Sequence, residues 1–204
     1  MSAIDMTFAV DFIQAFLVNI SVGFASLLVG LVIGIPFAYA WYAWGFIADL
    51  IGVVVGLLRA SPVFVFMFLC LNILTQVIDG DSAMASFEPM IALVLALSGY
   101  SISVVADTWL DLLKRYGAMT RESIMLAIPI HIRTFVILAM STSVGAAIGV
   151  QEAVMLTLTR VETLSTRQDQ IELVSVVLLF FVVFFSAARY LIVLLTPHLN
   201  KKSG

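Results

Sequence analysis

Five long stretches of this chain contain no charged residue. Asp, Glu, Lys and Arg are all absent from residues 12–48, 60–78, 89–106, 134–151 and 173–188. Each run is long enough, or nearly so, to cross about 30 Å of hydrocarbon as an α-helix. The composition agrees, because 62% of the residues are hydrophobic and only 11% are charged. The pattern predicts an all-α polytopic membrane protein whose five transmembrane helices form a single transmembrane domain, residues 1–204.

The charge-free runs also place the individual segments. We expect spans at about residues 13–41, 62–78, 89–106, 131–156 and 171–196. The first is longer than a bilayer requires, so it should tilt or bend, with Gly34 and Pro36 as the bend site. Its small residues, including Gly30 and Gly34, predict close approach of another helix. Residues 46–58 are apolar but short, which favours a helix lying at the membrane interface.

The basic residues predict the orientation of the chain. With five spans and the N-terminus outside, only Arg160 and Arg167 fall on the outer side. Cytoplasmic segments of membrane proteins are enriched in Lys and Arg. We therefore expect an outer N-terminus, a cytoplasmic C-terminus and a cytoplasmic loop at about residues 107–130. The basic residues on the cytoplasmic side are then Arg59, Lys114, Arg115, Arg121, Arg133, Arg189, Lys201 and Lys202.

Motifs for catalysis, nucleotide binding and metal binding are missing from the sequence. It has no Gly-x-x-x-x-Gly-Lys-Ser/Thr and no Gly-x-Gly-x-x-Gly, and Cys70, His131 and His198 do not have the spacing of metal ligands. It also lacks the basic patch with interleaved aromatic residues that nucleic acid requires. We expect no enzyme activity, no metal and no cofactor in this chain.

Three partial motifs occur in order along the chain. They are Leu58-Arg59-Ala60-Ser61-Pro62-Val63, then Asp111-Leu112-Leu113-Lys114-Arg115-Tyr116-Gly117 followed by Ile128-Pro129, and last Thr142-Ser143 with Ala147-Ile148-Gly149-Val150-Gln151-Glu152. Together they resemble the membrane subunits of ABC-type importers of the polar amino acid uptake family. There the motifs read Arg-Gly-Thr-Pro-Leu, then Glu-Ala-Ala, three residues and Gly before Ile/Leu-Pro, and then Thr-Ser-Leu with Ile-Gly-Val-x-Glu.

This chain also departs from the family pattern. Both alanines of the second motif are leucine here, and its Glu is Asp. The family has an acidic residue three positions after the tyrosine of the third span, which is Tyr100 here. That position is Ser103 in this chain, and Asp107 follows one helical turn later. The segments from Tyr100 to Gly117 and from Pro129 to Thr142 are several residues shorter than in the family.

The resemblance implies a permease fold and a coupling role for the cytoplasmic loop. In the family, a short helix there fits a cleft on an ATP-binding subunit, and it needs buried apolar residues, a glycine turn and a charged rim. The corresponding residues are Leu112 and Leu113 for the buried positions, Gly117 for the turn, and Asp111, Lys114, Arg115, Arg121 and Glu122 for the rim. Pro129 is expected to start the fourth span sharply.

The resemblance also implies partners, a location and a solute path. The partners are cytoplasmic ATPase subunits that bind ATP and Mg²⁺, a second permease subunit, identical or related, an extracytoplasmic solute-binding protein, and the lipid of a bacterial inner membrane. Hydroxyl groups on the spans can bind a passing solute without burying charge. We expect such a path at Ser61, Ser101, Ser103, Thr142 and Ser143, with Glu152 at its outer end.

Two other functions are compatible with the sequence. The chain could be a small ATP-independent transporter or a channel subunit, or a membrane scaffold that has a permease fold and does not transport. The sequence identifies no solute.

Overall fold

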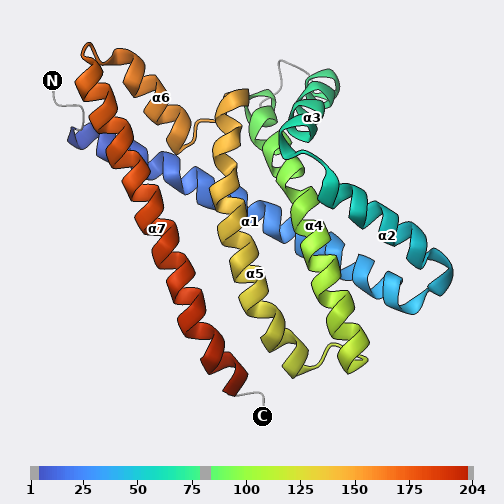
Figure 1. Ribbon diagram of the computed structural model, residues 1–204. Coiled ribbons are helices and arrows are strands. Elements are labelled where there is room, and N and C mark those ends of the chain that lie inside the picture. The colour runs from blue at the N-terminus through green and yellow to red at the C-terminus, as the bar shows by residue number, and fades with distance from the viewer. Residues whose placement is uncertain (1–4, 79–83, 202–204) are drawn as a thin grey trace.

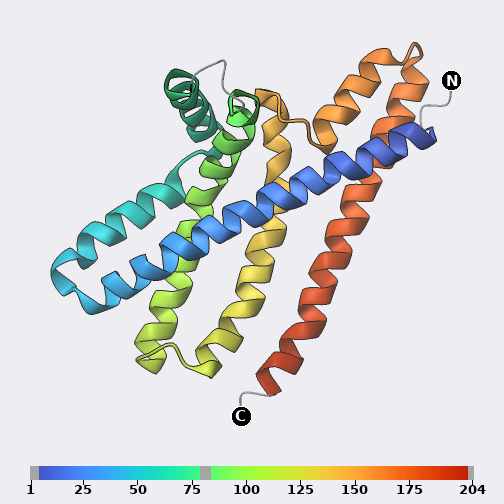
Figure 2. The ribbon, with the colours of Figure 1, turned by 180° about the vertical axis from the view of Figure 1, so that it is seen from behind.

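Helices account for all the regular structure of the computed structural model, which describes residues 5–78 and 84–201. Three long helices, α4, α5 and α7, run side by side, and α1 crosses them obliquely (Figures 1 and 2). The helices are α1 (Met6–Ala43), α2 (Gly45–Ala60), α3 (Val63–Val77), α4 (Glu88–Tyr116), α5 (Arg121–Ser141), α6 (Ala153–Thr163) and α7 (Arg167–Lys201), with short 3-10 helices η1 (Ala85–Phe87) and η2 (Thr142–Ile148).

Four of these segments are long and apolar enough to cross a membrane, counted over the described residues. They are α1, η1 with α4, α5 with η2, and α7 as far as Tyr190. The pair α2 and α3 passes the same test only when taken together, and its two helices are bent by 99°. The chain is therefore a multi-pass, all-α membrane protein with four spans, or five if the bent pair is one span, and the predicted fold class is confirmed.

Several predicted boundaries were wrong. The helix of the third span does not end at residue 106, because α4 continues to Tyr116 and buries Trp109, Leu110 and Leu113 against α1 and α5. Those residues recur at helical spacing, so packing extends the helix through a charged stretch. The predicted loop 107–130 is consequently reduced to the turn at residues 117–120, and α5 begins at Arg121.

The fourth span was also predicted incorrectly. Instead of one helix over residues 131–156, α5 ends at Ser141, η2 follows, and the chain turns at Gly149 before α6 begins. Gly149 has a φ of 84°, which only glycine adopts without strain. Pro129 does not start the span. It lies inside α5, which remains continuous from Arg121 to Ser141.

Small residues bring α1 and α4 together, as the sequence predicted. A Cβ placed on Gly30 would overlap the hydroxyl of Ser101, and one placed on Gly34 would lie 2.8 Å from the Val105 side chain. α1 continues as one helix through Pro36 to Ala43. Close helix packing of this kind is typical of membrane bundles, where apolar side chains gain little from avoiding lipid. α4 is therefore held at the centre of the bundle, where it also contacts α2, α3 and α5.

Aromatic rings join α1 to α7. Phe16 meets Phe180 edge to face with ring centroids 5.1 Å apart, and Phe184 at 4.8 Å. Phe12 meets Phe180 in the same way at 5.2 Å. Edge-to-face pairs of this kind stabilise packing beyond the buried area alone. They fix α7 against the N-terminal half of α1.

Candidate functional site

The α4–α5 hairpin ends in a tight, well-capped turn. Gly117 closes α4 in the left-handed conformation, with a φ of 74°, and its N–H donates to the Leu113 carbonyl. Thr120 then caps α5, since its Oγ1 accepts from Ser123 N while Ser123 Oγ accepts from Thr120 N. Such a capping box stabilises a helix start. The predicted turn at Gly117 is confirmed, and the hairpin is a defined structural unit.

The two leucines predicted to enter a partner are not available for that role. Leu112 and Leu113 are 9% and 2% exposed and pack within this chain against α1 and α5. The exposed apolar side chains at the hairpin are instead Met119 and Ile124, at 45% and 46%. The five charged residues predicted for the rim are all exposed: Asp111, Lys114, Arg115, Arg121 and Glu122. The five charged residues predicted for the rim are therefore exposed at the hairpin, together with the apolar Met119 and Ile124.

A side-chain hydrogen bond links the two helices of the hairpin. Trp109 Nε1 on α4 donates to His131 Nε2 on α5 at 3.1 Å, and their rings stack with centroids 6.2 Å apart. His131 therefore accepts a hydrogen bond in its neutral form. The contact, together with the buried leucines, makes the hairpin a packed pair of helices rather than a flexible loop.

The predicted solute path is mostly buried inside this chain. Ser101, Ser103, Thr142 and Glu152 are completely buried, while Ser61 and Ser143 are partly exposed. Ser103 donates to the Tyr100 carbonyl within α4. The four buried residues are therefore packed positions within this chain. Their assignment to a solute path stays a prediction, as does that of Ser61 and Ser143.

Glu152 has a structural role that the sequence did not suggest. It was expected to face arriving solute, but its carboxyl caps the N-terminus of α6, accepting from Val154 N at 3.0 Å and Met155 N at 2.9 Å. Carboxylates are favoured at helix N-termini, where backbone N–H groups are unpaired. Its third donor is Asn19 of α1, at 2.8 Å.

Asn19 completes a buried network that spans the break after α5. Its Nδ2 donates to Glu152 Oε2 and, at 2.7 Å, to Thr142 Oγ1, and its Oδ1 accepts from Ala153 N at 3.1 Å. Thr142 in turn donates to the Ala139 carbonyl. Asn19 is completely buried. One amide therefore joins α1, η2 and α6, and an Asn within the first predicted span was the available sequence signal.

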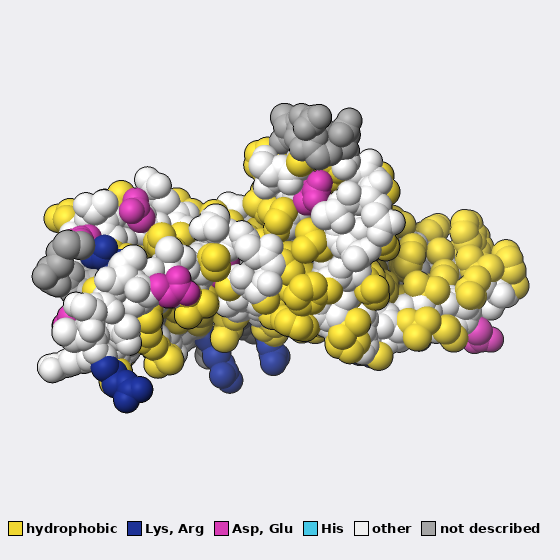
Figure 3. Space-filling view, turned by 90° about the horizontal axis from the view of Figure 1, so that it is seen from above, with side chains coloured by type: hydrophobic (Ala, Val, Ile, Leu, Met, Phe, Trp, Pro, Cys, Tyr) yellow, Lys and Arg dark blue, Asp and Glu magenta, His cyan; other side chains and the backbone are white. Residues whose placement is uncertain are grey.

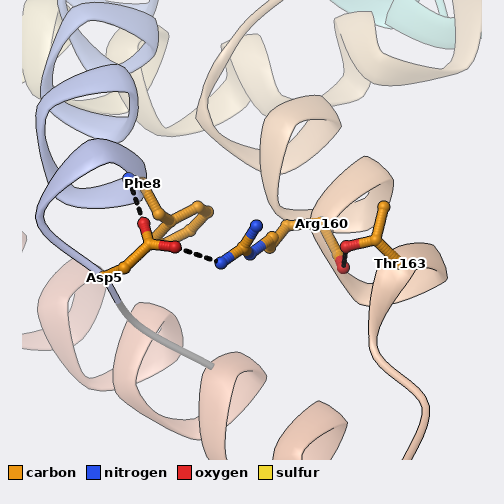
Figure 4. A network of polar contacts seen from close by, with 4 residues as sticks. All are labelled: Asp5, Phe8, Arg160 and Thr163. Atoms are coloured by element: carbon orange, nitrogen blue, oxygen red, sulfur yellow. Dashed lines mark hydrogen bonds and ion pairs between the residues drawn. The ribbon is translucent and has the colours of Figure 1, made fainter. Parts of the chain in front are cut away.

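The end of the molecule opposite the hairpin has an open, charged groove between α1 and α6. Asp5 accepts from Phe8 N at 2.7 Å and pairs with Arg160 at 2.6 Å (Figure 4). The Phe8 hydrogen bond and the Arg160 guanidinium lower the pKa of Asp5. The groove, of about 340 Å³, is also lined by Asp11. Figure 3 looks onto this end and shows acidic side chains among uncharged ones, with basic side chains projecting along one edge.

A second ion pair lies beside the break between α2 and α3. Arg59, in the last turn of α2, pairs with Asp107 of α4, and their side chains are 54% and 38% exposed. The sequence placed Arg59 in a cytoplasmic segment and did not pair it. Lys202, assigned to the same side, lies outside the described residues.

Comparison with known proteins identifies the fold. No protein-family model and no curated protein matches the chain. Two solved structures match along nearly the whole length. One is described as a crystal structure of an amino acid ABC transporter with histidines. It has a TM-score of 0.76 and 16% sequence identity, and the match covers 94% of this chain and 95% of that chain. The other is an inward-facing form of the MetNI methionine ABC transporter. It has a TM-score of 0.70 and 13% sequence identity, and the match covers 96% of this chain and 99% of that chain.

The fold is that of ABC transporter membrane subunits. The likeness extends over nearly the whole chain, since the matches cover 94% and 96% of it. The expected permease fold is confirmed at this level.

Proposed function

We propose that this chain is the permease subunit of an ATP-driven ABC importer for polar amino acids or similar small solutes. The observation that carries the proposal is the likeness of the whole fold to two ABC transporters, over 94% and 96% of the chain. ATP and Mg²⁺ are bound by a separate ATPase, because the sequence has no nucleotide-binding motif. The chain supplies the translocation unit.

The α4–α5 hairpin is the proposed contact with the ATPase. α4 has 29 residues, so it is about 43 Å long and exceeds the hydrocarbon thickness of about 30 Å. Its hairpin end can therefore project from the membrane. The tip presents Met119 and Ile124 within the charged rim, an apolar centre with a polar border that is typical of protein interfaces. The Trp109–His131 bond would help transmit movement of the tip to the spans.

The remaining partners follow from the same proposal. We place the hairpin and the C-terminus in the cytoplasm and the α1–α6 groove outside a bacterial inner membrane. A second permease subunit, identical or related, completes the translocation unit, and a solute-binding protein delivers solute from outside. The basic residues at the hairpin, Lys114, Arg115 and Arg121, support this orientation.

Co-purification tests the assembly. A tagged copy is extracted from its native membrane in mild detergent, and the proteins that accompany it are quantified by mass spectrometry. We expect an ATP-binding subunit in stoichiometric amount, and the ratio of permease chains shows whether the second subunit is the same protein. Reproducible absence of an ATPase would contradict the proposal and favour an ATP-independent transporter, a channel subunit or a scaffold.

A single substitution tests the hairpin. Met119→Asp places a charge at the apolar tip without disturbing a buried residue, so we expect loss of the co-purifying ATPase with unchanged membrane yield. Met84→Asp is the matched control, since Met84 is 57% exposed and lies before η1 at the other end of α4. Retention of the ATPase by the Met119 variant would show that the contact lies elsewhere.

Accessibility to a reagent tests the orientation. In a Cys70→Ala background, cysteines at Met84 and Met119 are treated separately with a membrane-impermeant thiol reagent applied from outside intact cells. We expect labelling at position 84 and none at 119. The opposite pattern would reverse the proposed topology.

A further inference from the structure

The open face of α4 is polar in the half that leads to the hairpin. Tyr100, Val104, Asp107 and Asp111 follow one another at spacings of four, three and four residues, so they lie on one face of the helix. All four are partly or fully exposed, whereas the intervening Ile102, Val105, Ala106, Trp109 and Leu110 are buried. The uncovered stripe on this part of α4 therefore carries polar groups from Tyr100, Asp107 and Asp111 beside the apolar Val104, with the partly exposed Thr108 next to it.

The position of Asp107 indicates what this stripe faces. Asp107 is 19 residues beyond Glu88, about 28 Å along α4, which is close to the hydrocarbon thickness of about 30 Å. Tyr100 lies deeper, about 18 Å along the helix. Carboxylates within or at the edge of a span avoid lipid and face water or protein. The stripe therefore faces water or protein, and not lipid, at the hairpin side of the membrane.

Arg59 adds a positive charge at the same place. It reaches from the last turn of α2 to Asp107, beside the break that separates α2 from α3. Among the side chains of residues 5–78 and 84–190, neither makes any other hydrogen bond or ion pair. The guanidinium has five N–H donors and the carboxylate has two oxygens, so both retain unused hydrogen-bonding capacity.

From this geometry we propose that Arg59 and Asp107 bind a zwitterionic amino acid at the hairpin-side mouth of the solute path, with Arg59 taking the α-carboxylate and Asp107 the α-ammonium group. The inference rests on the proposed importer function and adds the residues that recognise the solute. An ion pair whose members are about half exposed contributes little net stability, so a solute can separate it at low cost. Arginine is suited to the task because its planar group binds carboxylates in bidentate fashion.

Uptake measurements test this site. The permease is expressed with its native partners, and membrane vesicles receive an isotope-labelled mixture of the twenty L-amino acids, with uptake quantified by mass spectrometry. We expect Arg59→Gln and Asp107→Asn each to lower uptake of the transported amino acid by about 10- to 100-fold, since each removes a charge-assisted contact. Asp5→Asn and Arg160→Gln remove equivalent charges from the other ion pair and serve as controls that retain uptake.

A second readout separates recognition from a structural role. The transported amino acid is compared with its decarboxylated amine, which lacks the group assigned to Arg59. Wild type should prefer the amino acid, and Arg59→Gln should lose most of that preference while the ATPase still co-purifies and the thermal unfolding temperature is unchanged.

Three outcomes would contradict the proposed binding site. The first is unchanged uptake in both variants, and the second is a fall in uptake that leaves the preference for the amino acid intact. The third is equal loss of uptake, ATPase association and stability. If the wild-type complex contains an ATPase but imports no amino acid, the site is overturned and coupling to the ATPase stands. If no ATPase accompanies the chain, the importer proposal also fails.

Discussion

Replacing Asn19 by alanine should destabilise the protein strongly, because this side chain joins three elements in a fully buried location. The substitution removes two donations from Nδ2, to Thr142 and Glu152, and the bond that Oδ1 accepts from Ala153 N. Each of the two lost Nδ2 donations costs about 1 kcal/mol, and leaving the buried Ala153 N–H unpaired costs about 1–3 kcal/mol. The expected loss of unfolding free energy is therefore about 3–5 kcal/mol.

The loss can be measured as a fall in unfolding temperature. For a chain of this size each kcal/mol corresponds to about 2–4 °C, so Asn19→Ala should unfold about 6–20 °C below wild type. A maleimide dye that fluoresces on reaction with Cys70 reports unfolding, since that residue is the chain's single cysteine and is buried. All variants are heated at one fixed rate in the same detergent, because the unfolding temperature of an irreversible transition depends on scan rate.

Two controls define what would refute the reasoning. Gln14→Ala removes an exposed amide from the same helix and should shift the unfolding temperature by less than about 2 °C. The double variant Asn19→Ala with Glu152→Ala should lose less stability than the sum of the single variants, because their shared bond is counted twice in that sum. An Asn19→Ala shift as small as that of Gln14→Ala, or strict additivity in the double variant, would show that the network does not hold the break together.

Three further predictions address the packing of α4 and its turn. Gly117→Ala should lower the free energy of unfolding by about 1 kcal/mol through backbone strain alone, since the added Cβ would meet no atom within 4 Å. Thermal unfolding measures this loss, with Ala118→Gly as the control. Gly30→Ala should destabilise the α1–α4 contact, and Ser101→Gly in the same chain should restore most of the loss; absence of rescue would contradict the contact. Trp109→Phe removes the donor to His131 together with part of a buried ring and should cost at least about 1 kcal/mol, whereas no change in unfolding temperature would argue against the bond.

Local sequence patterns were sufficient for some of the coupling region but not for all of it. Gly117 was predicted as the turn because a helix ending needs a residue that tolerates a positive φ, and its φ is 74°. The charged rim was predicted from the resemblance to the family, whose docking helix carries charged residues at its border. The apolar centre was not, because Leu112 and Met119 differ little in hydrophobicity. Only the packing of α1 and α5 determines that the first is buried and the second exposed.

The sequence by itself determined that this chain is an all-α membrane protein and approximately where most spans lie. A transmembrane helix is recognised from about 20 predominantly apolar residues, so a few polar residues within it do not hide it. Gly30 and Gly34 likewise predicted a close helix contact, because the absence of a side chain on one helix face can be read from the sequence of that helix alone. The tertiary structure alone decided that the fourth span breaks, and that Arg59 meets Asp107. Asn19 and Glu152 lie 133 positions apart, and such pairings depend on how whole helices cross, which no local window of sequence contains.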